Sequence, residues 1–217
     1  MKTDTQLKND VMEELRWEPS VTMSDISIAT HNGVVTLSGS VPTYAEKGAA
    51  ERATRRVEGV KGIAEEMEVN PGRMHQHNES EIAEAVVNAL RWHVWVPSSV
   101  QATVDDGWVT LTGSVTWDFQ RNAAADAIDH LSGVIGVSNK IAITPIVQPN
   151  AVKDAIEGAL KRNAEIDGEH ITVSAEGGDV TLTGQIGSWG QRDETETAAW
   201  NAPGVTNVEN HLTVSMS

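Results

Sequence analysis

Three stretches of the chain share one alternation of apolar and polar residues. They are residues 33–41, 107–115 and 178–186, and their apolar side chains stand at matching positions: Val35, Leu37 and Val41; Val109, Leu111 and Val115; Val180, Leu182 and Ile186. A period of two predicts a β-strand with one buried face and one polar face. The chain therefore contains the same predicted half-buried strand three times.

Glycines recur at fixed positions around these strands. The glycines inside the strands are Gly39, Gly113 and Gly184, and a second set follows at a constant interval, each before a valine: Gly59, Gly133 and Gly204. We expect the strand glycines on the buried face, where a missing side chain lets a helix pack closely. Gly59 suits a left-handed helix cap, and Pro203-Gly204 should end the second helix of the last repeat. A register kept through three copies predicts three structural repeats.

Helical and strand patterns surround each copy in the same order. In the first repeat, Leu7, Val11 and Leu15 recur every four residues, which predicts a helix over about residues 4–16. A strand with Ile26 and Ile28 then precedes an Asn-Gly pair suited to a tight hairpin turn. Thr43 and Glu46 in the first repeat, and Ser188 and Gln191 in the third, have the spacing of a capping box and predict the start of a second helix. In the first repeat, alternating Ile63, Met67 and Val69 then predict a closing strand.

These patterns predict an α+β fold made of three tandem αββαβ units. In each unit, two helices should pack on one face of a three-stranded mixed sheet. We expect the units at residues 1–70, 78–144 and 149–217. The second helix of the middle unit is predicted to use Ala123, Ala127, Ile128 and Leu131.

Composition narrows the range of functions. The chain has no Cys, which excludes disulfides, thiolate catalysis and the commonest zinc sites. Its net charge is −15, and residues 149–217 carry four basic and eleven acidic side chains. Because nucleic-acid binding rests on clustered Lys and Arg, we do not expect nucleic acid as a partner. The first ten residues hold no apolar run of signal-peptide length, so we expect a cytoplasmic protein rather than a periplasmic one.

Motifs for catalysis or cofactor binding are missing from the sequence. It has no phosphate loop, no nucleophile elbow and no calcium loop. His75 and His77 stand in the first linker without a thiol or carboxylate at ligand spacing. We therefore expect no catalytic residues, no cofactor and no metal.

Tryptophan is the unusual residue of this chain, with seven copies beside one Tyr and one Phe. Five lie near helix ends or linkers: Trp17, Trp92, Trp95, Trp117 and Trp189. Trp108 lies on the outward face of its strand. The densest patch surrounds Trp92 and Trp95 and also contains Val94 and Val96. One interpretation is protein contact, either packing between repeats or self-association as a homo-oligomer. The alternative is a peripheral phospholipid surface, because Trp favours bilayer interfaces.

The combined motifs resemble the BON (bacterial OsmY and nodulation) domain. They are the hairpin ending in Gly-x-Val-x-Leu-x-Gly and a closing Gly-Val-x-x-Val with Asn two residues later, as at Asn139 and Asn210. Glu65 stands at that position in the first repeat. We expect the two asparagines to pin the preceding loop through backbone hydrogen bonds. The resemblance implies the αββαβ fold and a non-catalytic binding module, associated with envelope stress, osmotic shock and, in some members, phospholipid contact.

Overall fold

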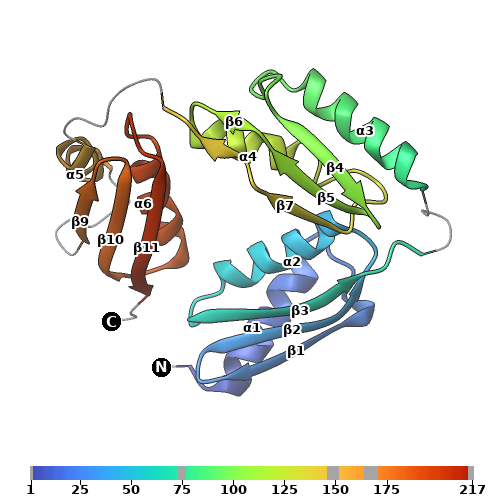
Figure 1. Cartoon of the computed structure of the whole chain (residues 1–217). Coiled ribbons are helices and arrows are strands. Elements are labelled where there is room, and N and C mark those ends of the chain that lie inside the picture. The colour runs from blue at the N-terminus through green and yellow to red at the C-terminus, as the bar shows by residue number, and fades with distance from the viewer. Residues whose placement is uncertain (1, 73–76, 146–151, 164–170, 215–217) are drawn as a thin grey trace. The chain divides into compact units, whose positions relative to one another are not determined.

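The computed structural model describes residues 2–72, 77–145, 152–163 and 171–214 (Figure 1). The chain divides into two compact units. One comprises Met1–Thr112 with Ala123–Lys140, and the other comprises Gly113–Asn122 with Ile141–Ser217. Segments of the predicted middle repeat therefore occur in both units.

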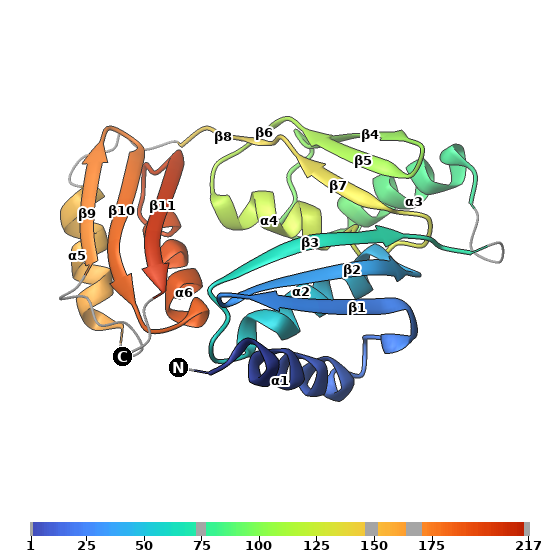
Figure 2. The same ribbon diagram turned by 90° about the horizontal axis from the view of Figure 1, so that it is seen from below.

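The first repeat has the predicted order of elements. They are α1 (Asp4–Trp17), a short 3₁₀ turn η1 (Met23–Asp25), β1 (Ile26–His31), β2 (Val34–Val41), α2 (Tyr44–Arg56) and β3 (Gly62–Val69). In the sheet, β2 is central, with β1 antiparallel and β3 parallel to it. Both helices lie on the same side of this sheet (Figure 2).

The core of the first repeat follows the sequence pattern closely. Leu7, Val11 and Leu15 are all buried, and they share one apolar cluster with Val35 and Leu37 of β2. The hairpin turn has positive φ at both of its residues, 52° at Asn32 and 85° at Gly33, as a type I′ turn requires. The predicted strand alternation and the predicted turn are confirmed.

The middle repeat keeps the order but interrupts its elements. They are α3 (Glu79–Trp92), β4 (Gln101–Asp105), β5 (Trp108–Thr112), β6 (Ser114–Val115), α4 (Asp118–Asp126), β7 (Gly136–Asn139) and β8 (Ala142–Ile143). The predicted single strand breaks at Gly113, where φ is +117°. β5 pairs with β4 and β7, and β6 pairs with β8.

The predicted extent of the second helix in this repeat was wrong. α4 ends at Asp126, so Ala127, Ile128 and Leu131 lie beyond it. There the chain tightens into turns, because the N–H of Ile128 donates to Ala125 O and that of Leu131 donates to Ile128 O, each three residues back. Ile128 is nevertheless fully buried.

The third repeat restates the fold of the first. Its elements are α5 (Val152–Arg162), β9 (Ile171–Glu176), β10 (Asp179–Ile186), α6 (Trp189–Trp200) and β11 (Asn207–Val214). β10 is central, antiparallel to β9 and parallel to β11. Its apolar cluster joins α5 residues such as Ile156 to Val180 and Leu182 of β10. The α+β class with tandem αββαβ units is confirmed.

The explanation offered for the strand glycines was wrong at Gly39 and Gly113. Both residues are exposed, so no helix packs on them. At Gly39 φ is +118°, and a Cβ built there would lie 1.9 Å from the carbonyl oxygen of Asp25, the last residue of η1. Gly113 and Gly184 have similar φ values of 117° and 138°. These glycines are needed for backbone geometry.

Gly59 has the expected left-handed geometry, and the other two glycines of the second set share it. Their φ values are 108° at Gly59, 88° at Gly133 and 94° at Gly204. The two predicted capping boxes are only half formed. Thr43 and Ser188 accept the N–H of Glu46 and Gln191, but the Glu46 side chain accepts from Thr22 N–H and that of Gln191 from Gly187 N–H.

Candidate interaction surface

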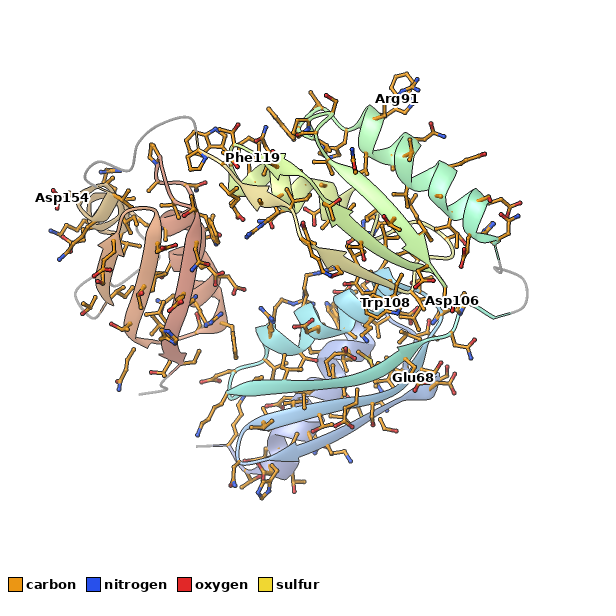
Figure 3. The ribbon with its side chains drawn as sticks, viewed as in Figure 1. Glu68, Arg91, Asp106, Trp108, Phe119 and Asp154 are labelled. Atoms are coloured by element: carbon orange, nitrogen blue, oxygen red, sulfur yellow. The ribbon has the colours of Figure 1, made fainter. Side chains whose placement is uncertain are left out.

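The last turn of α3 places a tryptophan outside the core. The buried stripe of this helix is Ile82, Val86 and Leu90, and Trp92 comes two residues after Leu90. Because successive helical residues are about 100° apart, two steps carry Trp92 to the opposite side of the helix. Its side chain is 79% exposed, and the Arg91 guanidinium lies 5.9 Å from its ring centre. Arg91 marks this end of α3 in Figure 3.

The chain then leaves α3 through two tight turns. The Val96 N–H donates to His93 O at 3.1 Å, and Val100 N–H donates to Pro97 O at 3.1 Å. These turns leave Val96 half-buried but expose Val94 by 82% and Trp95 by 56%. We call Trp92, Val94 and Trp95 the Trp92 surface. Three neighbouring apolar side chains in solvent are typical of an interaction site.

Trp17 occupies the equivalent place at the end of α1. Leu15-Arg16-Trp17 matches Leu90-Arg91-Trp92, and Trp17 is 83% exposed. The residues that follow Trp17 are Glu18, Pro19 and Ser20, so the first repeat offers one exposed ring without the valine and second tryptophan.

The remaining predicted contact residues lie on other elements. Trp108 is 52% exposed on β5 and covers its register partner Gly136, where a Cβ would meet the indole ring at 2.5 Å. Trp189 begins α6, is half-buried and has the Arg192 guanidinium 5.5 Å from its ring centre. Trp117 is half-buried before α4. The rings of Trp108 and Trp189 have contacts within the fold and Trp117 is half-buried, so the strongest candidate is the Trp92 surface.

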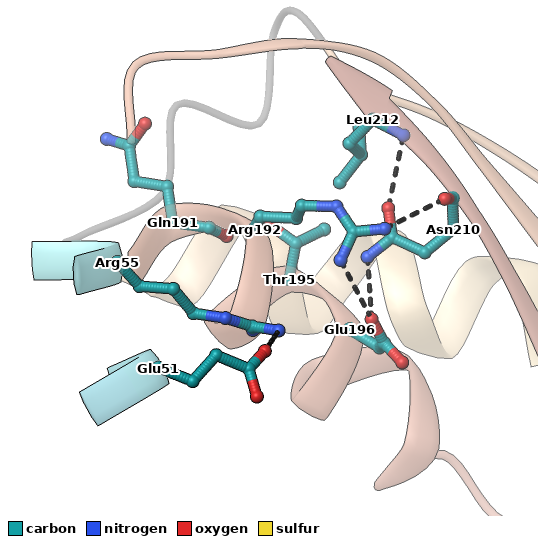
Figure 4. A network of polar contacts seen from close by, with 8 residues as sticks. All are labelled: Glu51, Arg55, Gln191, Arg192, Thr195, Glu196, Asn210 and Leu212. Carbon is teal, nitrogen blue, oxygen red and sulfur yellow. Dashed lines mark hydrogen bonds and ion pairs between the residues drawn. The ribbon is translucent and has the colours of Figure 1, made fainter. Parts of the chain in front are cut away.

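Asn210 connects the closing strand of the third repeat to its second helix (Figure 4). Its Oδ1 accepts the Leu212 N–H at 3.1 Å, and its Nδ2 donates to Glu196 at 2.8 Å. Arg192 donates to the Asn210 carbonyl at 3.0 Å. The expectation that Asn210 pins the preceding loop was wrong, because its amide bonds the strand that follows it and the helix above it.

Glu65 forms similar contacts with strand and helix in the first repeat. Leu37 faces Glu65 in the sheet as Leu182 faces Asn210, so the two residues share a register position, which Asn139 holds opposite Leu111. Glu65 accepts the Met67 N–H at 2.7 Å and pairs with Lys47 of α2 at 2.7 Å. A side-chain oxygen, rather than an amide group, is what the first and third repeats have in common here.

Two carboxyl groups have raised pKa values. Burial raises the pKa of Asp118 and of Asp129 above the ordinary range of a carboxyl group. Arg121 forms an ion pair with Asp118, and Nδ1 of His130 lies 2.7 Å from a carboxylate oxygen of Asp129. His75 lies outside the described residues, and within those that are described no three His, Cys, Asp or Glu gather as metal ligands. Across the same residues, no helix is long and apolar enough to cross a bilayer.

The sequence reasoning missed the surroundings of Asp118. Trp117, Asp118 and Trp200 line one small cavity in the second unit. Trp200 was not singled out, although its position at a helix end before Pro203 matches the placement of the other tryptophans. The sequence did not indicate that Asp118 is buried, because its burial depends on tertiary packing.

Comparison with known proteins agrees with the repeated fold. The BON domain model matches three times, at residues 3–71, 78–145 and 150–216. The osmotically-inducible protein Y of Escherichia coli strain K12 is 26% identical over 143 residues, which cover 64% of this chain and 71% of that protein.

Two solved structures are also similar over most of the chain. CdsD, a structural protein of the type III secretion system of Chlamydia trachomatis, is 16% identical with a TM-score of 0.27, covering 96% of this chain and 92% of its own. The PrgH periplasmic domain is 12% identical with a TM-score of 0.22, covering 95% and 99%. TM-scores this low support neither a fold nor a function. The three family matches span nearly the whole sequence, so the chain belongs to the BON domain family and carries three copies in tandem.

Proposed function

We propose that this chain is a non-catalytic, stress-associated binding protein that self-associates or binds a protein partner through the Trp92 surface. The observation that carries the proposal is the exposure of Trp92, Val94 and Trp95 at one helix end. Large aromatic side chains with an adjacent Arg are the residues that most often dominate protein interfaces. The stress association rests on the similarity to an osmotically-inducible protein.

Size-exclusion chromatography with light scattering tests the self-association. We expect the wild-type chain to elute as an oligomer and the Trp92→Ala, Trp95→Ala double variant as a monomer. Trp17→Ala is the matched control, because Trp17 has the same helix-end position and similar exposure but no apolar neighbours in sequence. A monomeric wild type would refute self-association, and pull-down with both variants would then test a protein partner.

Peripheral lipid binding through the same surface is the second candidate. The pairing of Arg91 with the exposed ring of Trp92 favours it, since Trp and Arg side chains both suit the bilayer interface. Liposome flotation at low salt, with zwitterionic and anionic vesicles in separate runs, tests this function. Recovery of all protein in the bottom fraction of both runs would exclude it.

The cytoplasmic location expected from the sequence is part of this proposal. Fractionation of the native host tests it directly. A cytoplasmic protein should remain with the spheroplasts, whereas release by osmotic shock would place the protein in the periplasm and overturn that expectation.

A further inference from the structure

The second unit contains a small cavity that shares no residue with the Trp92 surface. Its volume is about 190 Å³. Two indole rings, two prolines, one valine and one carboxylate form most of its wall: Trp117, Trp200, Pro145, Pro203, Val205 and Asp118. Apolar pockets with one charged group commonly bind small ligands.

The chemistry of the wall favours a positive charge. Aromatic faces attract cations, and the structure has one such contact here, with the Arg121 guanidinium carbon 4.6 Å from the centre of the Trp200 ring. Arg121 also forms an ion pair with Asp118, whose other oxygen accepts from Asn122 Nδ2 at 2.8 Å. No Lys, Arg or His is among the described residues that line the cavity.

The charges near Asp118 also favour a cationic ligand. Burial raises the pKa of this carboxyl, and the nearby Glu196 adds to the rise, despite the opposing effects of Arg121 and Asn122. Of these causes, the negative charge of Glu196 is the one that would also attract a cationic ligand. Residues 149–217 carry a net charge of −7, from four basic and eleven acidic side chains.

Hydrogen-bonding capacity separates one class of cation from another. A guanidinium or primary ammonium brings several N–H donors, and each donor that stays unpaired in an apolar cavity is unfavourable. The side-chain acceptors in the described wall are only the Asp118 carboxylate and the Thr116 hydroxyl. A methylated ammonium has no N–H donor, and aromatic walls are the usual site for it.

We propose that this cavity, the Trp117–Trp200 pocket, binds a quaternary ammonium head group. The cation packs against the two indole rings, and the Asp118 carboxylate, which also pairs with Arg121, lines the pocket beside it. Such a head group occurs in free solutes and in zwitterionic lipids, and the pocket chemistry is the same for both. This function goes beyond contact through the Trp92 surface and does not depend on it.

Titration of the full chain with choline chloride tests the pocket, with the indole N–H signals of Trp117 and Trp200 followed by NMR. We expect both signals to shift saturably, while sodium chloride has no such effect. The uncharged carbon analogue 3,3-dimethylbutan-1-ol has the same shape and should bind about tenfold more weakly, as the loss of a cation–π contact implies. Equal binding of the two compounds, or no saturable shift with choline, would overturn the proposal.

Variants and vesicles complete the test. Trp117→Leu should weaken choline binding about tenfold, and Trp17→Leu, at an exposed ring outside the pocket, should leave it unchanged. Phosphatidylcholine vesicles replace free choline in a second arm. Shifts of the Trp117 and Trp200 signals with vesicles would identify lipid as a source, and shifts with choline alone would identify a free solute. A Trp17→Leu effect as large as that of Trp117→Leu would contradict the assigned site.

Discussion

At Gly39 the backbone has a φ of +118°, and the carbonyl oxygen of Asp25 fills the space where a side chain would begin. Gly39→Ala should therefore lower the free energy of unfolding by at least about 2 kcal/mol, since strain and a clash with backbone add together. Gly177→Ala is the matched control, because φ there is +60° with no atom within 4 Å of the new Cβ. It should cost only about 1 kcal/mol. Urea unfolding followed by circular dichroism compares them, and equal costs would contradict the close approach of Asp25.

A second residue-scale prediction concerns Asp118. Its pKa is raised in the folded chain, so folding favours the protonated form, and this contribution to stability is present at acid pH and lost as pH rises through the folded pKa. Asp118→Asn resembles the protonated carboxyl. We expect the variant to be more stable than wild type at pH 7, with the difference shrinking toward the ordinary carboxyl pKa of about 4.

The measurement is the difference in unfolding midpoint between Asp118→Asn and wild type, taken at several pH values. Asp154→Asn serves as control because Asp154 is exposed on α5. A variant less stable than wild type at pH 7 would show that the ion pair with Arg121 outweighs the burial of the carboxylate.

At the scale of elements, α6 and β11 are joined through Asn210. Asn210→Ala removes the acceptor of the Leu212 N–H and the donor to Glu196. We expect it to lower the free energy of unfolding by about 1–2 kcal/mol. Asn207→Ala, at an exposed position of the same strand, should change stability by less than about 0.5 kcal/mol. Thermal unfolding compares the two, and equal effects would refute the role of this connection.

Sequence patterns predicted the elements well where local chemistry decides them. The stripe of Leu7, Val11 and Leu15 and the Asn32-Gly33 turn depend on neighbours within a few residues, and the structure has both. The break of the middle sheet at Gly113 and the early end of α4 could not be predicted. The first depends on the pairing of β6 with the distant β8, and the second on a change to hydrogen bonds that reach three residues back. The spacing of apolar residues encodes neither.

The candidate site was predictable only in part. Exposure of Trp92 follows from its phase on α3 relative to Leu90, which the sequence contains. The cover that Trp108 provides for Gly136 depends on strand register, and the Trp117–Trp200 pocket joins residues more than eighty positions apart. Such combinations become visible only in three dimensions.

At the scale of the molecule, the first and third repeats each have an apolar cluster of their own residues. A fragment of residues 1–71 should therefore fold alone and unfold cooperatively, with a urea m-value near 1 kcal/mol/M, as befits a very small domain. Circular dichroism during urea titration checks this. The fragment with Leu15→Asp is the control, since a charge at this buried position should abolish the transition. A gradual loss of signal in the unmodified fragment would contradict an independent core.

The distribution of tryptophans also decides what a fluorimeter would detect. Trp17 is the single indole in residues 1–70, and its ring is already 83% exposed to water in the folded chain. Its emission should hardly change when that repeat melts, whereas the half-buried rings of Trp117, Trp189 and Trp200 would shift to the red. Unfolding curves from emission and from ellipticity would then differ even if each repeat melts in one step, and the mismatch would reflect where the chromophores lie.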